Sequence, residues 1–155
     1  MKKWHGFSLS CIVIILDQLS KYWAVKSLLP YQPVPVMPMF NFTLAYNTGA
    51  AFSFLSKSGE WHRWFFAGFS LLMSAVLIIW ILRTANTAKL QILSLSLILG
   101  GAIGNLIDRA LLGHVTDFIE LYYKHYHWPV FNLADAAICI GALILFIDLC
   151  KNPRT

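Results

Sequence analysis

The sequence is poor in charge, since only 12% of its 155 residues are Asp, Glu, Lys or Arg, while 58% are hydrophobic. Soluble domains average about a quarter charged residues, and a fold this short leaves much of its surface exposed. The composition therefore excludes a water-soluble enzyme, a disordered tail and a secreted module held together by disulfides. The mean hydropathy of +0.64 indicates an integral membrane protein.

Cysteines and basic runs are also scarce. Cys11, Cys139 and Cys150 lie inside apolar stretches, and we expect them to be buried small hydrophobic residues rather than disulfide or metal ligands. The net charge of +5 comes from scattered basic residues that form no stripe, which argues against a nucleic-acid partner. The aromatic content of 15% fits a partnership with membrane lipids, because Trp and Tyr rings favour the headgroup zone.

Metal-binding patterns are missing as well. His125 and His127 lie two residues apart with His114 and Glu120 nearby, but no His-Glu-x-x-His helix is present. We interpret these histidines as interfacial residues and predict neither a metal nor a cofactor.

Four apolar stretches are long enough to cross a bilayer, which takes about 20 helical residues. Two of them, 64–82 and 90–107, contain no ionisable side chain. The start resembles a secretory signal peptide but lacks a small-residue cleavage site, so we expect a retained first helix. The prediction is a single domain, 1–155, with helices over about 7–29, 64–82, 90–110 and 133–150.

Basic residues predict the orientation, because cytoplasmic loops of membrane proteins are rich in Lys and Arg. One side of the predicted bundle carries basic residues and no acids in its termini and loop, namely Lys2, Lys3, Arg83, Lys89, Lys151 and Arg154. We therefore expect both termini in the cytoplasm and the two long segments, 30–63 and 110–132, outside. The long segments would then face a periplasm or the cell exterior, and any site within them would lie near the outer face of the membrane.

The long segments carry the pattern of strands. Apolar and polar residues alternate from Phe40 to Asn47, as in a half-buried strand. Asn47-Thr48-Gly49 has turn chemistry, residues 51–54 alternate again, and 114–123 predicts a further strand. The predicted fold class is an all-α membrane protein with four transmembrane helices and a small outer β-sheet cradle, formed within about 31–60 and 112–131. Its expected aromatic rim consists of Trp61, Trp64, Tyr122, Tyr126 and Trp128.

Polar residues at membrane depth need an explanation, because they are costly there. Asp17 and Lys21 lie four apart on one helix face and are expected to pair. Structural pairing is the favoured interpretation, and a role near the chemistry stays open. The glycines of 100–104 are expected to allow close helix packing rather than nucleotide binding.

Asn105 and Asp108 share one face at the end of the third helix, followed by Arg109. Two interpretations are equally open: an acid and a base that anchor the helix end, or a polar face that holds a peptide backbone.

Asp117 and Asp135 lie on either side of an excursion that leaves the third helix and returns to the fourth. Asn132 is a candidate N-cap with Asp135 as the third helical residue, which would explain both without catalysis. Alternatively the two aspartates form a pair that shares one proton, so that one carboxyl activates water and the other protonates a carbonyl. The residues alone leave both possibilities open.

Five motifs in order resemble the lipoprotein signal peptidases (signal peptidase II), which are membrane aspartic peptidases of bacteria. The motifs are Asp17-Gln18-x-x-Lys21, Asn47-x-Gly49-Ala50-Ala51-Phe52, Gly100-Gly101-Ala102-x-Gly104-Asn105-x-x-Asp108-Arg109, Val115-x-Asp117-Phe118 and Phe131-Asn132-x-Ala134-Asp135.

The resemblance implies a substrate, a prolipoprotein whose future N-terminal cysteine bears diacylglyceryl, with cleavage just before that cysteine. It implies sensitivity to the cyclic peptide globomycin. We also expect the protein to act as a monomer. The resemblance also implies that Asp117 and Asp135 are catalytic. The polar positions that would line its substrate site are Asn47, Asn105, Asp108, Arg109 and Asn132.

Asp108 competes for a catalytic role. Because Arg109 is adjacent in sequence, we expect Asp108 to stay ionised and to position substrate. Asp117 has apolar neighbours and no adjacent base, which favours Asp117 with Asp135.

Two rival functions remain. A small proton or cation transporter would use intramembrane acids near the midplane, whereas Asp108, Asp117 and Asp135 are predicted at the outer edge. A non-catalytic assembly subunit would tolerate Asp117→Asn.

Overall fold

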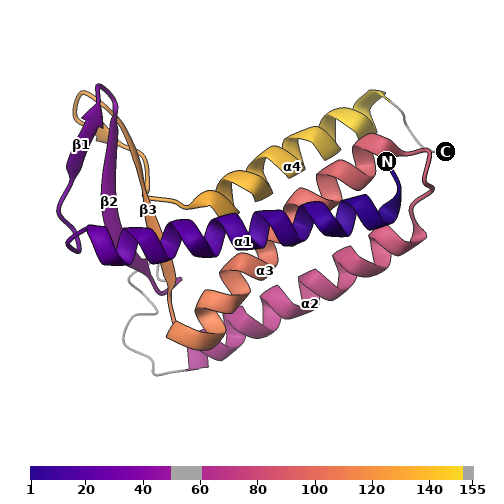
Figure 1. Cartoon of the computed structure of the whole chain (residues 1–155), viewed down its shortest axis with the longest axis horizontal. Coiled ribbons are helices and arrows are strands. Elements are labelled where there is room, and N and C mark those ends of the chain that lie inside the picture. Colours follow the sequence, from indigo (N-terminus) through magenta and orange to yellow (C-terminus); the bar gives the residue numbers. More distant parts are fainter. Residues whose placement is uncertain (50–60, 152–155) are drawn as a thin grey trace.

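The computed structural model of the chain describes residues 1–49 and 61–151, and it consists of four long helices with a small sheet at one end (Figure 1). Each helix carries a stretch long and apolar enough to cross a membrane. The predicted fold class is therefore confirmed. The helices are α1 (Lys3–Ser27), α2 (Trp61–Arg83), α3 (Lys89–Leu112) and α4 (Leu133–Lys151).

Helix α3 lies at the centre and packs against each of the other three helices. Its glycines make these approaches close, as predicted. A Cβ on Gly100 would meet Val13 of α1, and a Cβ on Gly101 would meet the backbone oxygen of Ala134 in α4. Small residues in α3 therefore let the backbones of α1 and α4 approach it closely.

The outer surfaces of α1, α2 and α4 are apolar and exposed in the isolated chain, as expected of helices whose solvent is lipid. Cys11, Cys139 and Cys150 all lie on these surfaces. Their predicted burial is therefore wrong, because an apolar stretch in a membrane helix need not face the protein interior.

The sheet has four antiparallel strands in the order β1-β2-β3-β4. The strands are β1 (Val34–Met37), β2 (Phe40–Asn47), β3 (Val115–Tyr123) and β4 (Tyr126–His127). Strands β2 and β3 match the two predicted at 40–47 and 114–123. The strand predicted at 51–54 lies outside the described residues.

One face of the sheet packs on the end of α1. Leu44 and Phe118 are buried there against Ala24 and Leu28, and the Trp23 ring meets the edge of Phe42. Asp117 and Phe118 are successive residues of β3, so their side chains point to opposite faces of the sheet. Asp117 shares its face with Ala45, its pairing partner in β2. The apolar face thus anchors the sheet to the bundle and leaves Asp117 on the other side of β3.

The start of α1 and the end of α4 lie together at the end of the bundle away from the sheet (Figure 1). Of the expected aromatic rim, Trp64, Tyr126 and Trp128 are exposed and Tyr122 is half-buried, while the side chain of Trp61 lies outside the described part.

Candidate active site

Two carboxyl groups share Asn132 as a hydrogen-bonding partner where the sheet joins the helices, and we call Asp117 of β3 and Asp135 of α4 the carboxylate pair. Asp117 is only 2% exposed. Asn47 donates its Nδ2 to Asp117 Oδ2 at 3.1 Å, and Asn105 donates its Nδ2 to Asp135 Oδ1 at 2.8 Å. The side-chain donors to both carboxyls, among the described residues, are neutral amides.

Asn132 links the two carboxyls. Its Nδ2 donates to Asp117 Oδ1 at 2.7 Å, and its Oδ1 accepts the backbone N–H of Asp135 at 2.9 Å. The backbone N–H of Asn132 in turn donates to Asp135 Oδ2 at 3.3 Å, which completes a reciprocal cap of α4. The predicted cap of α4 is therefore present, and because the same Asn132 amide also bonds Asp117, capping does not exclude the pairing interpretation.

The pKa of Asp117 is raised to about 6, mainly by burial and in smaller part by the negative charge of Asp135. The hydrogen bonds from Asn47 and Asn132 offset part of this effect. A carboxyl with such a pKa can hold a proton close to neutral pH, which a proton donor in catalysis requires.

Asn105 connects the carboxylate pair to a second group of acidic and basic side chains, which we call the buried ion cluster: Asp17, Lys21 and Asp108. The Lys21 ammonium lies 2.8 Å from Asp17 Oδ2 and 3.0 Å from Asp108 Oδ2. All three side chains are at least 96% buried. The expected pairing of Asp17 with Lys21 is present.

The cation beside Asp108 is therefore Lys21 rather than Arg109, contrary to expectation. Successive helical residues point about 100° apart, so Asp108 faces α1 while Arg109 turns away. Arg109 Nη1 donates to Ser70 Oγ at 3.5 Å and to the Asn105 backbone oxygen at 3.4 Å, and the guanidinium lies 5.9 Å from the Phe66 ring centre.

The comparisons with known proteins agree with this architecture. A family model described as "Signal peptidase (SPase) II" matches residues 9–151. The chain belongs to the signal peptidase II family. The family is one of peptidases, so the protein is a hydrolase of peptide bonds.

Relatives and solved structures support the assignment. The chain is 49% identical to a lipoprotein signal peptidase of Cellvibrio japonicus (strain Ueda107), over 97% of this chain and 88% of the relative. It is 47% identical to that of Coxiella burnetii (strain RSA 493 / Nine Mile phase I), over 99% and 94%. A bacterial membrane enzyme solved at 1.9 Å by the in meso method is similar in fold, with a TM-score of 0.85, 32% identity and coverage of 96% and 94%. The protein is thus a multi-pass bacterial membrane protein.

Residues with no role assigned from sequence complete the site of this signal peptidase II family member. Gln18 Nε2 donates to Asp108 Oδ1 at 2.9 Å and to the Gly104 backbone oxygen at 3.2 Å, so it binds α1 to α3 beside the buried ion cluster. Its position next to Asp17 in a membrane helix was the available signal.

Glu120 also has a partner set that the sequence did not reveal. It accepts hydrogen bonds from Asn41 at 3.1 Å and Thr43 at 2.5 Å, and it lies 2.8 Å from His127 Nδ1. Burial raises the pKa of Glu120, but these bonds outweigh it and lower the pKa below its ordinary value. Glu120 therefore accepts hydrogen bonds from two polar side chains of β2.

Residues 1–49 and 61–151 contain no group of three or more His, Cys, Asp or Glu able to hold a metal ion.

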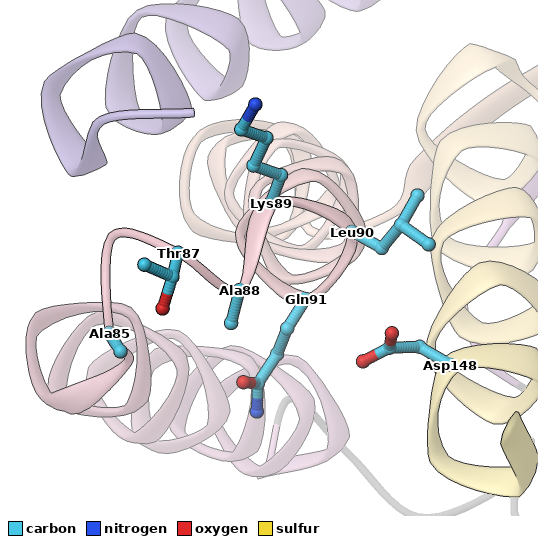
Figure 2. Close-up of a pocket in the computed structure, with 7 residues that line it drawn as sticks. All are labelled: Ala85, Thr87, Ala88, Lys89, Leu90, Gln91 and Asp148. Carbon is cyan, nitrogen blue, oxygen red and sulfur yellow. The ribbon is translucent and has the colours of Figure 1, made fainter. Parts of the chain in front are cut away.

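A separate pocket of about 560 Å³ lies at the end of the bundle away from the sheet. It is lined by the loop between α2 and α3, the start of α3, and Asp148, whose side chain extends from α4 toward α3 (Figure 2). None of its lining residues belongs to the carboxylate pair or the buried ion cluster.

Proposed function

We propose that the protein is a membrane aspartic endopeptidase that removes the signal peptide from diacylglyceryl-modified prolipoproteins, cleaving just before the lipid-modified cysteine. The observation that carries the proposal is the carboxylate pair: two carboxyls linked by the Asn132 side chain, one of them with a pKa of about 6. The names of the relatives supply the substrate class.

In this mechanism Asp117 holds the shared proton and Asp135 is ionised. Asp135 accepts a proton from a water molecule as the water oxygen attacks the scissile carbonyl carbon, and Asp117 donates its proton to the carbonyl oxygen. The tetrahedral intermediate then collapses as the C–N bond breaks. The leaving amine takes the proton gained by Asp135, and the proton of the hydroxyl returns to Asp117. Both carboxyls thus end in their starting states, and no cofactor is required.

The polar residues around the pair divide by exposure. Asn47 is exposed and Arg109 is half-buried, so both are assigned to contact the substrate peptide. Asn105, Asp108 and Asn132 are buried, and they are assigned to hold the pair and the adjoining backbone in place. Asp117 and Asp135 are the catalytic residues.

The position of the site suits a substrate that is anchored in lipid. The pair lies at the junction of the membrane helices and the sheet, where a cleavage site next to a diacylglyceryl cysteine would lie at the bilayer surface. We place the sheet outside a bacterial inner membrane and both termini in the cytoplasm. The protein acts as a monomer and is inhibited by globomycin, in line with the family resemblance.

The test is cleavage by purified protein in lipid, with the same prolipoprotein supplied with and without the diacylglyceryl group. Mass spectrometry of the products is expected to show a free N-terminal cysteine that carries diacylglyceryl. The unmodified substrate is expected to stay intact. Globomycin is expected to block cleavage.

The matched controls are Asp117→Asn and Asp135→Asn, each checked for folding. Both are expected to cleave nothing detectable. A folded wild-type protein that leaves the modified substrate intact, or one that cuts at another bond, would contradict the proposal.

A further inference from the structure

Lys21 uses all of its hydrogen-bonding capacity inside the bundle. The ammonium has three N–H donors and no acceptor, and three acceptors lie at bonding distance: Asp17 Oδ2 at 2.8 Å, Asp108 Oδ2 at 3.0 Å and Asn105 Oδ1 at 3.0 Å. The side chain is 4% exposed. A buried ammonium with this partner set is fixed in one position.

Each of the three acceptors continues to the carboxylate pair. Asn105 Nδ2 donates a hydrogen bond to Asp135 Oδ1. Asp17 Oδ1 accepts the backbone N–H of Ala134 at 3.0 Å, and Asp108 Oδ2 accepts the backbone N–H of Thr116 at 3.0 Å. Ala134 and Thr116 are the residues directly before Asp135 and Asp117 in the chain. Three routes therefore lead from one ammonium to within one residue of both carboxyls.

We propose that Lys21 is a positioning residue for catalysis, which aims the Asn105 amide at Asp135 and fixes the backbone directly before each member of the carboxylate pair. The inference rests on the proposed function, and it assigns the buried ion cluster a role beyond holding α1 against α3.

The direction of the Asn105 amide makes the role specific. An amide has an oxygen that only accepts and a nitrogen that only donates. Lys21 can bond only the oxygen, so the nitrogen must turn to Asp135. The flipped amide would place its NH₂ against the ammonium and its oxygen against the carboxylate, and both contacts would be repulsive. Asn132 Nδ2 donates to the same Asn105 oxygen at 3.2 Å, so loss of the ammonium weakens the preference for this orientation without removing it.

Lys21→Met tests the proposal, because it keeps an unbranched side chain only one atom shorter and removes the three donors. Its matched control is Lys26→Met, which removes the same charge from an exposed position on the same helix. We expect Lys21→Met to lower kcat by about 10- to 100-fold and to change KM less than about threefold, since the substrate contacts are not touched. Lys26→Met is expected to keep the wild-type kcat and KM.

A second variant guards against loss of folding. Lys21→Met leaves two buried carboxylates without a cation, whereas the double variant Asp17→Asn/Lys21→Met keeps the net charge of the cluster unchanged. The double variant is expected to fold and to show a loss of kcat at least as large as that of a folded Lys21→Met. If neither variant folds, the cluster is a folding element only and the proposal is overturned.

The route through Asn105 is tested by combining Lys21→Met with Asn105→Ala. Because both changes break one route, the combined loss of kcat is expected to be smaller than the product of the single losses. A folded Lys21→Met or charge-matched variant with wild-type kcat, or single losses that multiply, would overturn the proposal. Failure of the proposed function would be distinct, because the wild-type protein itself would then not cleave.

Discussion

The protein buries aspartates in two neighbouring regions that differ in their donors. In the buried ion cluster, Asp17 and Asp108 accept hydrogen bonds from the Lys21 ammonium. In the carboxylate pair, Asp117 and Asp135 accept from the amides of asparagines and from a backbone N–H. Both regions are built from the same residue type: Asp17, Asp108 and Asp117 are at most 3% exposed, and Asp135 is half-buried.

The difference in donor decides what each carboxyl can do. The ammonium holds both carboxyls of the cluster in ion pairs, and each carboxyl also accepts a backbone N–H, from Ala134 or Thr116. A neutral amide stabilises a carboxylate less strongly than a charged donor does. Burial therefore dominates at Asp117 and raises its pKa to about 6. In the proposed mechanism the buried ion cluster positions the neighbouring groups, and the carboxylate pair transfers the proton.

Asn132→Asp tests this contrast with the largest expected effect. Asp is as good an N-cap as Asn, so the cap of α4 is retained while a third negative charge replaces a neutral donor beside Asp117. We expect kcat to fall on the order of 10²- to 10³-fold, as when one preorganised donor is lost, and the melting temperature to fall as well, because a further buried carboxyl replaces the donor to Asp117. Cleavage assays with thermal unfolding in the same detergent measure both. A variant with wild-type kcat would show that the neutral donor is not needed.

Asp117→Asn tests the electrostatic cost of the pair. The folded pKa of Asp117, about 6, lies above its ordinary value of 3.8. Between these values the folded state binds more protons than the unfolded state, so its stability falls as pH rises from about 4 to about 6. The loss is complete above pH 6 and amounts to about 3 kcal/mol at most.

Asn cannot ionise, so this pH-dependent loss should be absent from the variant. Relative to the wild type, Asp117→Asn is expected to gain stability between pH 4 and pH 8 while cleavage is lost. Thermal unfolding across that range measures the gain. Parallel stability curves for the two proteins would show that Asp117 has an ordinary pKa.

Gly104→Ala tests how tightly the buried ion cluster is packed. A Cβ at Gly104 would lie 2.6 Å from Asp17 Oδ2, so the cluster or the helices must shift. We expect a loss of about 1–3 kcal/mol of stability, typical of overpacking. Gly68→Ala is the control, because a Cβ there meets no atom within 4 Å. Equal melting temperatures for the two variants would show that the cluster is not tightly packed.

Sequence reasoning found the elements whose signals are local. Long apolar stretches predicted the four helices, alternation predicted β2 and β3, and the spacing of Asn132 and Asp135 predicted the cap that is present. Composition along a short window is sufficient for these features, because each depends on the hydrogen bonds or the solvent of its own segment.

The sequence could not reveal which partners meet across the fold. Lys21 lies 84 residues from Asn105 and Glu120 lies 77 residues from Thr43, so no local pattern joins them. Arg109 was expected beside Asp108 because it is adjacent in sequence, yet helix geometry separates the two side chains. The exposed cysteines were misjudged because hydropathy does not distinguish a lipid-facing surface from a core.

The most direct test is a single-turnover cleavage rate for three variants measured side by side: Asp108→Asn, Asp117→Asn and Asp135→Asn, at equal amounts of folded protein. The account predicts that the two variants of the carboxylate pair lose on the order of 10⁴-fold or more, as when a catalytic group is removed. Asp108→Asn should retain measurable cleavage, reduced by about 10- to 100-fold. An Asp108→Asn variant as inactive as the other two, or a pair variant that still cleaves at a comparable rate, would contradict the division of roles between the two regions.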